Sequence, residues 1–346
     1  MDFLDFTAGD DDGGRRLDKI ARSLAERVPL SEIYKCLRKG LLRVNGKRAA
    51  ANLRISPGDV ISLPSFLLDF SPGSADKPRP SEKDSFSCAA GPEKSAESRS
   101  LDIVFENDNF LVLNKPYDVP VHSGGRAGKS ALDVMVREYL SDSGALSRSV
   151  SFSPGPLHRL DRKTSGLIVF SKSLAGARWF SERVRTRSVK KTYHAVILGH
   201  LPKEKKWKDY ILCDNSGGDG FHTVECRNER PGAAWKIALT SARPEGYGQH
   251  DGMDVTLAEV SIQTGRKHQI RAQCASHGYP LLGDTAYGSP PLPSCHARDF
   301  YLAATSLALP EEFSDNPAGF PPFLSLDADA EFFDIIKYCD IKKIGV

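Results

Sequence analysis

The feature that most limits the folds open to this chain is a stretch at 65–100 in which Ser, Pro, Gly, Lys, Glu and Asp dominate. A segment of that composition cannot bury enough apolar surface to fold alone. It predicts a flexible linker, and a chain of 346 residues is long enough for a folded domain on each side of it. We therefore expect an acidic tail at 1–14, a small domain at 15–64 and a larger domain at 101–346.

The overall composition excludes several classes of protein. An apolar fraction of 40% and a charged fraction of 26% are typical of a soluble globular chain. No stretch approaches the roughly 20 apolar residues of a membrane helix, and the acidic N-terminus has the wrong sign for a secretory signal. The seven cysteines are odd in number and form no C-x-x-C pair, which argues against a disulfide framework or a zinc ribbon. We expect a monomer in the reducing cytoplasm, without membrane contact.

The small domain at 15–64 carries twelve Lys and Arg against four acids, a net charge of +8 in a chain whose total is only +3. Apolar residues at helical spacing from Leu17 predict one helix, and the stretch from Ser31 to Gly40 predicts a second. Asn45-Gly46 predicts a β-hairpin. Two short helices and a hairpin with this charge indicate a phosphate-contacting module, although a merely solvated basic surface has the same composition. The residues expected to bind RNA are Arg16, Lys19, Lys35, Arg38, Lys39, Arg43, Lys47 and Arg48.

The larger domain alternates short apolar stretches with turns and with a few helical patterns. Strands are expected at 103–106, 110–113, 167–171 and 255–262, among others. They alternate with hairpins and helices without a regular βαβ rhythm. This order predicts an α+β fold, with a mixed, largely antiparallel sheet flanked by helices.

The densest motif of the chain runs from His158 to Gly166 and reads H-R-L-D-R-K-T-S-G. A turn signal at its end leads into an apolar run that predicts a buried strand. The motif therefore presents the Asp161 carboxylate on a loop, among three cations: Arg159, Arg162 and Lys163. Nearby cations favour the ionised carboxylate and would attract a polyanion such as RNA. The alternative is a solvated turn with local ion pairs.

Other catalytic signatures are absent from the sequence. It has no G-x-S-x-G elbow, no phosphate-binding G-x-x-x-x-G-K-[ST] loop and no H-x-E with C-x-x-C of a zinc deaminase. No histidine pair has metal-ligand spacing near acids. What remains is one loop carboxylate, Tyr193 on a later strand and several arginines, a set suited to chemistry on an RNA base without a metal or nucleotide cofactor.

The H-R-L-D-R-K-T-S-G motif resembles the catalytic motif of the RluA family of pseudouridine synthases, most closely its RluC type, which modifies large-subunit ribosomal RNA. Four further segments resemble the family and occur in its order: V-L-N-K-P, K-T-Y-H-A-V-I-L-G, T-G-R-K-H-Q-I-R and G-Y-P-L-L-G-D-T-A-Y-G. The stretch from Val28 to Arg48 resembles a small RNA-binding fold shared with a ribosomal small-subunit protein. Gln273 stands where many relatives have histidine.

The resemblance implies roles for individual residues. Asp161 matches the essential aspartate, Tyr193 the tyrosine that packs on the target base, and Arg271 the basic residue that pairs with the aspartate. Ile270 matches the apolar residue of the pocket, and Arg159 the arginine that helps displace the target nucleotide. The remaining two cations of the loop, Arg162 and Lys163, are expected to contact phosphate or to balance local charge.

The implied reaction is the isomerisation of uridine to pseudouridine in RNA, without metal or cofactor. The expected substrate and partner is large-subunit ribosomal RNA or its assembly intermediate. A transfer-RNA pseudouridine synthase and a non-enzymatic RNA-binding or assembly factor are the alternatives. Whether Asp161 attacks as a nucleophile or removes a sugar proton as a base stays open.

Overall fold

The computed structural model describes residues 2–25, 28–68, 100–123, 131–143, 149–212, 224–293, 296, 298–310, 316 and 318–344. The chain forms two compact units, one of Met1–Leu101 with Leu140–Ser153 and the other of Asp102–Tyr139 with Pro154–Val346. Most of the linker expected at 65–100 lies outside the described residues.

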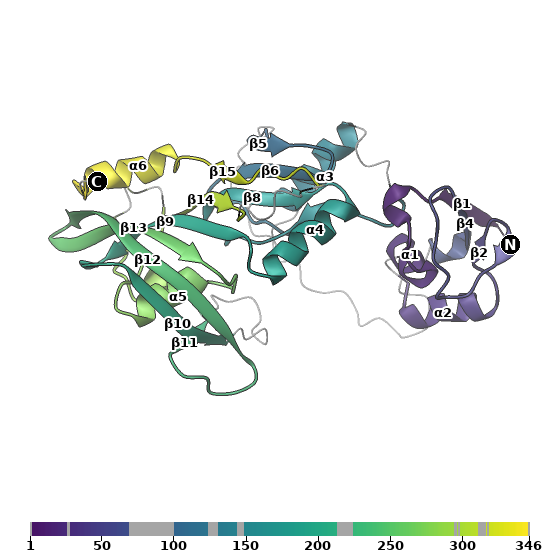
Figure 1. The fold of residues 1–346 in the computed structure, drawn as a ribbon, viewed down its shortest axis with the longest axis horizontal. Coiled ribbons are helices and arrows are strands. Elements are labelled where there is room, and N and C mark those ends of the chain that lie inside the picture. Colours follow the sequence, from purple (N-terminus) through teal and green to yellow (C-terminus); the bar gives the residue numbers. More distant parts are fainter. Residues whose placement is uncertain are drawn as a thin grey trace, which may run out of the picture. The chain divides into compact units, whose positions relative to one another are not determined.

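The first unit is a four-stranded antiparallel sheet with two helices (Figure 1). The strand order is β1-β4-β2-β3, with β1 at Phe3–Thr7, β2 at Arg43–Val44, β3 at Lys47–Arg48 and β4 at Val60–Pro64. The helices are α1 at Leu17–Leu24 and α2 at Leu30–Arg38, and short 3-10 turns lie at Asp10–Asp12 and Ser65–Leu67.

The amphipathic pattern explains this arrangement. The apolar stripe of α1 buries Leu17 and Ile20, α2 buries Ile33, and β4 contributes Ile61 to the same core. The hairpin between β2 and β3 turns at Asn45-Gly46, where both residues have positive φ (51° and 75°), as the favoured two-residue hairpin turn requires. The two predicted helices and the predicted hairpin are therefore present.

Three segments depart from the expected boundaries of the small domain. Residues 65–67, expected in the linker, form a 3-10 turn whose Leu67 is buried in the core of this unit. Residues 3–7 pair with β4 in the sheet, in contrast to the tail expected at 1–14. The segment 149–151, assigned by the sequence to the larger domain, is held by Asp12, whose carboxylate accepts hydrogen bonds from the Ser149 and Ser151 hydroxyls and from the Val150 amide. Burial by itself raises the pKa of Asp12, but these hydrogen bonds outweigh it and lower the pKa below its usual value.

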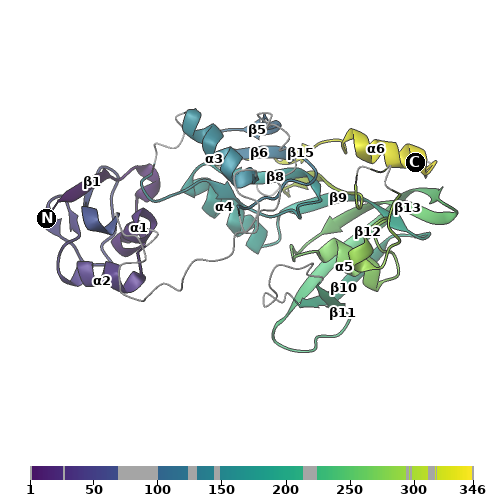
Figure 2. The same cartoon turned by 180° about the vertical axis from the view of Figure 1, so that it is seen from behind.

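The second unit is built on one sheet of twelve strands within the described residues, as seen from both sides in Figure 1 and Figure 2. The main strand order is β11-β10-β12-β13-β9-β14-β8-β6-β5, while β15 pairs with β14, β16 with β12 and β7 with β8. The strands are β5 Ile103–Glu106, β6 Phe110–Lys115, β7 Gly155–Pro156, β8 Ser165–Ser171, β9 Lys190–Leu198, β10 Lys205–Leu212, β11 Glu225–Arg227, β12 Trp235–His250, β13 Met253–Ile262, β14 Leu302–Ala308, β15 Phe323–Ser325 and β16 Lys342–Lys343. Every pairing is antiparallel except that of β8 with β14, which confirms the predicted mixed, largely antiparallel α+β fold.

The helices of this unit are α3 Leu132–Asp142, α4 Leu174–Arg185, α5 Gln269–Ser276 and α6 Ala330–Tyr338, with a 3-10 turn at Thr285–Tyr287. Phe180 of α4 packs with Phe110 of β6 and with Phe320. Phe332 and Ile335 of α6 pack with Val196 and Leu257 on β9 and β13. No helix among the described segments is long and apolar enough to cross a membrane.

The strand β14 joins the two halves of the sheet. It runs antiparallel to β9 and parallel to β8, so that Ala304 pairs with both Tyr193 and Gly166. Gly166 has φ 108°, and a Cβ there would lie 2.1 Å from the carbonyl oxygen of Ala304. Only glycine permits this approach. The approach places the loop that precedes β8 beside the middle of β9.

We predict that Gly166→Ala lowers the free energy of unfolding by about 3 kcal/mol, because the new methyl group adds both backbone strain and a clash with β14. Gly155→Ala, on the neighbouring β7 with no atom within 4 Å of its Cβ position, should change it by less than about 1 kcal/mol. Urea denaturation of the full chain measures both values. Equal effects of the two substitutions would contradict the assigned role of Gly166.

Candidate active site

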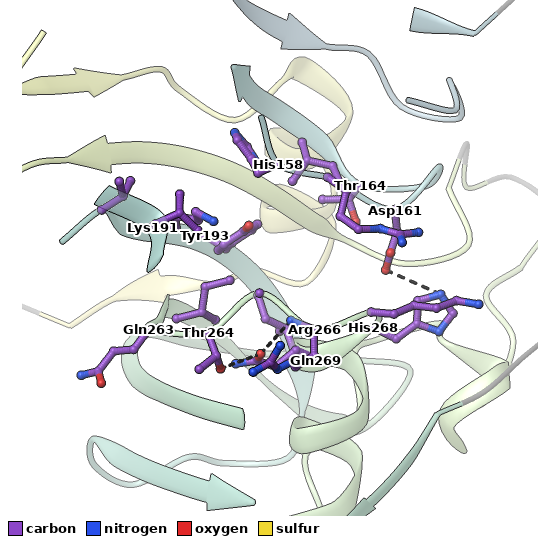
Figure 3. Close-up of a pocket in the computed structure, with 18 of the residues that line it drawn as sticks. His158, Asp161, Thr164, Lys191, Tyr193, Gln263, Thr264, Arg266, His268 and Gln269 are labelled. Carbon is purple, nitrogen blue, oxygen red and sulfur yellow. Dashed lines mark hydrogen bonds and ion pairs between the residues drawn. The ribbon is translucent and has the colours of Figure 1, made fainter. Parts of the chain in front are cut away.

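One pocket of about 440 Å³ brings the dense motifs together (Figure 3). Its walls come from three segments: 157–161 before β8, 184–193 at the end of α4 and the start of β9, and 262–271 from β13 into α5. This volume lies in the range of small-molecule sites. Asp161, Tyr193, Ile270, Arg271 and Arg159 all line it, so the structure brings these predicted site residues together.

Lys115, at the end of β6, fixes the loop that carries Asp161. Its side chain is fully buried, and Nζ donates hydrogen bonds to the carbonyls of Pro116 (2.9 Å), Val119 (2.8 Å) and Arg162 (2.9 Å). Burial lowers the pKa of Lys115 to about 7, although the charge of Asp161 opposes this shift. The sequence indicated the N-K-P segment as scaffold around the site, but not the three hydrogen bonds by which Lys115 holds the loop.

His158 has a structural role in the same loop. Its Nε2 accepts a hydrogen bond from the Val169 amide of β8 (3.1 Å), and its ring stacks against Phe180. Burial, with a smaller effect of the Lys191 charge, lowers the pKa of His158 well below its usual value. The ring is therefore neutral, with its proton on Nδ1, and it ties the start of the motif to the strand that follows.

The Asp161 carboxylate faces two nitrogens without a hydrogen bond to either. Its Oδ2 lies 3.8 Å from Arg271 Nη1 and 3.8 Å from His268 Nε2, and no described residue donates a hydrogen bond to its side chain. Its side chain is 18% exposed. The Asp161 oxygens therefore have lone pairs that no described residue occupies, and the Arg271 guanidinium lies close to them.

Arg271, near the start of α5, is held by Asp284 rather than by Asp161. Its Nε and Nη2 bind the two Asp284 oxygens at 2.7 and 2.8 Å, a bidentate geometry that fixes the guanidinium plane. The group lies 4.9 Å from the ring centre of Tyr287 and 4.5 Å from that of Phe300. Burial alone would lower the pKa of Arg271, but Asp284 and Asp161 outweigh it and raise the pKa. The resemblance predicted the approach of Arg271 to Asp161 but missed Asp284.

His268 completes the surroundings of Asp161. Burial lowers the pKa of His268 to about 4, although the Asp161 charge opposes this shift, so the ring is neutral. The Tyr287 hydroxyl accepts a hydrogen bond from the Val224 amide (2.9 Å) and lies 3.0 Å from His268 Nδ1. Donation from the Tyr287 hydroxyl to Nδ1 would place the ring proton on Nε2, facing Asp161.

Gln269 shapes the loop that enters α5. Its Oε1 accepts hydrogen bonds from the Thr264 hydroxyl and the Arg266 amide, and its Nε2 donates to the Leu239 carbonyl. Gln273, one turn later, is fully buried and bonds Asp209 and Thr240. Its amide is therefore satisfied within the scaffold, away from the pocket.

Tyr193 and Ile270 belong to the apolar part of the pocket lining and are 6% and 4% exposed. Burial, together with the Asp161 charge, raises the pKa of Tyr193, so its phenol stays protonated and neutral. A neutral aromatic ring beside an apolar side chain provides a surface on which a planar base can stack.

The three cations of the H-R-L-D-R-K-T-S-G motif divide into two groups. Arg159 is exposed, lines the pocket, and makes no hydrogen bond or ion pair through its side chain with any described residue. Arg162 pairs with Asp118 at 2.9 Å, and Lys163 pairs with Asp299. The residues that line the pocket include neither Arg162 nor Lys163, so the structure places both in local charge balance. Three further cations that line the pocket, Arg185, Arg187 and Lys191, were not singled out in the sequence, whereas Arg266 and Lys267 belong to the T-G-R-K-H-Q-I-R segment.

The eight basic residues singled out in the first unit all have exposed side chains. Arg16 pairs with Asp18, and Lys35 with Glu32. Arg43 and Arg48 lie opposite each other on β2 and β3, and the Arg48 side chain runs over Gly40, next to Lys39. The end of α2 and the hairpin thus present one basic surface. In the described segments of the chain, no three His, Cys, Asp or Glu side chains lie close enough together to hold a metal ion.

Comparison with known proteins gives a consistent result. Residues 109–276 match the family described as RNA pseudouridylate synthase. The chain is 30% identical over 288 residues to the ribosomal large subunit pseudouridine synthase C of Vibrio cholerae, covering 83% of this chain and 81% of that protein. It is 31% identical over 282 residues to the protein of that name from Yersinia pestis, covering 82% and 78%.

Solved structures agree in fold. Human RNA pseudouridylate synthase domain containing 4 has a TM-score of 0.53 at 22% identity, covering 70% of this chain and 94% of that chain. Human RNA pseudouridylate synthase domain containing 1 has a TM-score of 0.52 at 22% identity, covering 72% and 91%. At this identity the likeness concerns the fold alone.

We predict that Lys115→Met lowers the free energy of unfolding by about 3 kcal/mol or more, because three carbonyls lose their donor. The folded pKa of about 7 lies below the ordinary value of 10.5, so the unfolded chain binds more protons between these values. The stability of the wild type relative to Lys115→Met should therefore rise with pH across that window. Denaturant titrations at several pH values measure this difference. Lys163→Met, on the same loop, should show neither effect.

Proposed function

We propose that this chain, since it belongs to the RluA family of pseudouridine synthases, acts on large-subunit ribosomal RNA. It is an isomerase that converts uridine to pseudouridine. The choice of RNA is supported by the relatives from Vibrio cholerae and Yersinia pestis, whose names specify the large ribosomal subunit. The exposed basic side chains of the first unit suit a folded RNA. We further propose that the enzyme works as a monomer in the cytoplasm.

The observation that carries the proposal is the placement of Asp161. An ionised carboxylate with free lone pairs stands 3.8 Å from an arginine that is itself fixed by Asp284. Arg271 can therefore stabilise the charge on Asp161 without occupying its oxygens. Such a carboxylate suits either attack on the substrate as a nucleophile or removal of a sugar proton as a base.

A uridine within folded RNA must leave the base stack before Asp161 can reach its sugar, at a cost of a few kcal/mol. We assign the recovery of that energy to Tyr193, whose stacking contributes about 1–3 kcal/mol, and to Ile270 beside it. The exposed Arg159 guanidinium at the pocket is the group that takes the vacated place in the RNA. Arg185 and Arg187 are also exposed there and can contact the phosphates on either side.

We predict that Asp161→Asn lowers the isomerisation rate by at least about a thousandfold, because the amide can act neither as nucleophile nor as base. Unmodified large-subunit RNA tritiated at C5 of uridine reports the reaction by releasing tritium. Asp118→Asn is the matched control, because that carboxylate pairs with Arg162 outside the pocket. RNA affinity should be unchanged in both variants.

The same assay with transfer-RNA transcripts tests the choice of substrate. Release from large-subunit RNA alone supports the proposal, and release from transfer RNA alone overturns it. No release from either RNA would leave an RNA-binding or assembly factor as the better account of the chain.

A further prediction concerns the basic surface of the first unit. Replacing Lys39, Arg43 and Arg48 by Gln should weaken RNA binding about tenfold at low salt and make the slope of log K against log salt shallower by about 2, since each lost phosphate contact removes about 0.7–0.9. Filter binding at several salt concentrations measures both quantities. Replacing Lys337, Lys342 and Lys343, which lie in or beside α6 and β16, provides the charge-matched control. Equal effects of the two triple variants would contradict the assigned surface.

A further inference from the structure

Lys191, near the start of β9, is a buried cation without a counter-ion. It is 8% exposed, lines the pocket, and its side chain makes no hydrogen bond or ion pair with any described residue. Burial alone lowers the pKa of Lys191 to about 8, so at neutral pH the ammonium is still mainly protonated. A buried charge of this kind is costly unless it is paired, and the pocket is the space from which a partner can come.

The position of Lys191 relative to Asp161 defines that partner. Figure 3 draws Lys191 and Asp161 on opposite sides of the pocket, with Tyr193 between them. A Cβ on Gly265 would lie 3.8 Å from Lys191 Nζ, which places the ammonium beside the 264–266 loop. Lys191 is therefore at the end of the pocket away from the carboxylate.

Uracil has a carbonyl group at the corresponding end. With its sugar at Asp161 and its face on Tyr193, the part of a uridine that reaches farthest is C4=O4, which lies para to the glycosidic nitrogen N1. The isomerisation breaks the N1–C1′ bond and forms a C5–C1′ bond, while a proton leaves C5 and one is gained at N1. Rotation of the ring about its N3–C6 axis exchanges N1 with C5 and O4 with O2. The group para to the new bond is again a carbonyl, C2=O2.

We infer that Lys191 Nζ donates a hydrogen bond to the uracil carbonyl para to the glycosidic bond, O4 in the substrate and O2 in the product. This assignment rests on the proposed function, because it takes uridine as the nucleotide in the pocket. One donor then serves the base before and after its rotation and holds it while it is detached. Cytidine places an amino group at the same point, where donor would face donor, so Lys191 also selects uridine over cytidine.

A backbone phosphate fits Lys191 less well. Phosphates of a bound RNA stay at the mouth of the pocket, where the exposed side chains of Arg159, Arg185 and Arg187 lie. Only the extruded base reaches a side chain that is 8% exposed. The lining near Lys191 includes the apolar Val189 and Ile262, which suits the flat edge of a base.

The test compares two RNA oligonucleotides that span a uridine converted by the wild type. In one of them the target uridine is replaced by 4-thiouridine, which keeps the N3–H donor and has sulfur, a poor hydrogen-bond acceptor, in place of O4. Dissociation constants are measured in the Asp161→Asn background, so that no reaction occurs. Loss of O4 should weaken binding about tenfold or more when Lys191 is present, because a hydrogen bond to a charged donor is lost. With Lys191→Met the two oligonucleotides should bind within about twofold of each other.

Lys190→Met is the matched control, because that side chain is exposed and precedes Lys191 on the same strand; the full O4 effect should persist in it. If Lys191→Met does not fold, as judged by thermal denaturation, Lys191→Leu takes its place, because leucine also has no hydrogen-bond donor. If the protein that retains Lys191 binds the two oligonucleotides with equal affinity, the inference is overturned, and no substitution of Lys191 is needed to show it. An O4 effect that persists in Lys191→Met, with a salt slope shallower by about 0.7, would instead make Lys191 a phosphate ligand.

Failure of this inference differs from failure of the proposed function. Absence of tritium release from large-subunit RNA overturns the proposed substrate, whatever Lys191 does. Release with no difference between the two oligonucleotides overturns only the role of Lys191. If the converted uridine lies in a transfer RNA, the oligonucleotides follow that sequence and the comparison stays the same.

Discussion

The position of β14 between β8 and β9 is the constraint on which the site depends. Its pairing with β8 is the only parallel one in the described sheet, and it requires a glycine at 166, where any side chain would meet the Ala304 carbonyl. Because of this pairing, the loop before β8 and the middle of β9 open onto one pocket. A carboxylate and an aromatic ring from segments far apart in the chain thus face the same volume.

Around that pocket the structure assigns a partner to nearly every charge except those that face the space for RNA. Arg271 is neutralised by Asp284, Lys115 is surrounded by carbonyls, and Arg162 and Lys163 pair with Asp118 and Asp299. Asp161 accepts no hydrogen bond at its side chain, and Arg159 and Lys191 have no counter-ion among the described residues. Under the proposed function, the bound uridine would contact Asp161 and Lys191, and the RNA around it would contact Arg159.

Much of this could be predicted from local patterns. The helical spacing after Leu17, the Asn45-Gly46 turn and the apolar run after Gly166 each depend on near neighbours in the chain, and the structure has the corresponding elements. The H-R-L-D loop indicated Asp161 for the same reason. Asp284, Lys115 and the pairing of residues 3–7 with β4 were missed, because each depends on a contact between distant segments that no periodicity records.

By itself, the sequence determined the α+β class, the basic character of the first unit and the choice of Asp161 as the candidate carboxylate, since these follow from residue type and short-range spacing. Only the tertiary structure decided which cations serve the pocket. Arg159, Arg162 and Lys163 are equivalent in the sequence, yet Asp118 and Asp299 take the last two for local ion pairs. Lys191 begins the K-T-Y-H-A-V-I-L-G segment, but the sequence assigned it no role of its own; the structure buries it with no side-chain partner among the described residues. Charge is a property of the residue, but whether it is free to bind depends on what the fold places beside it.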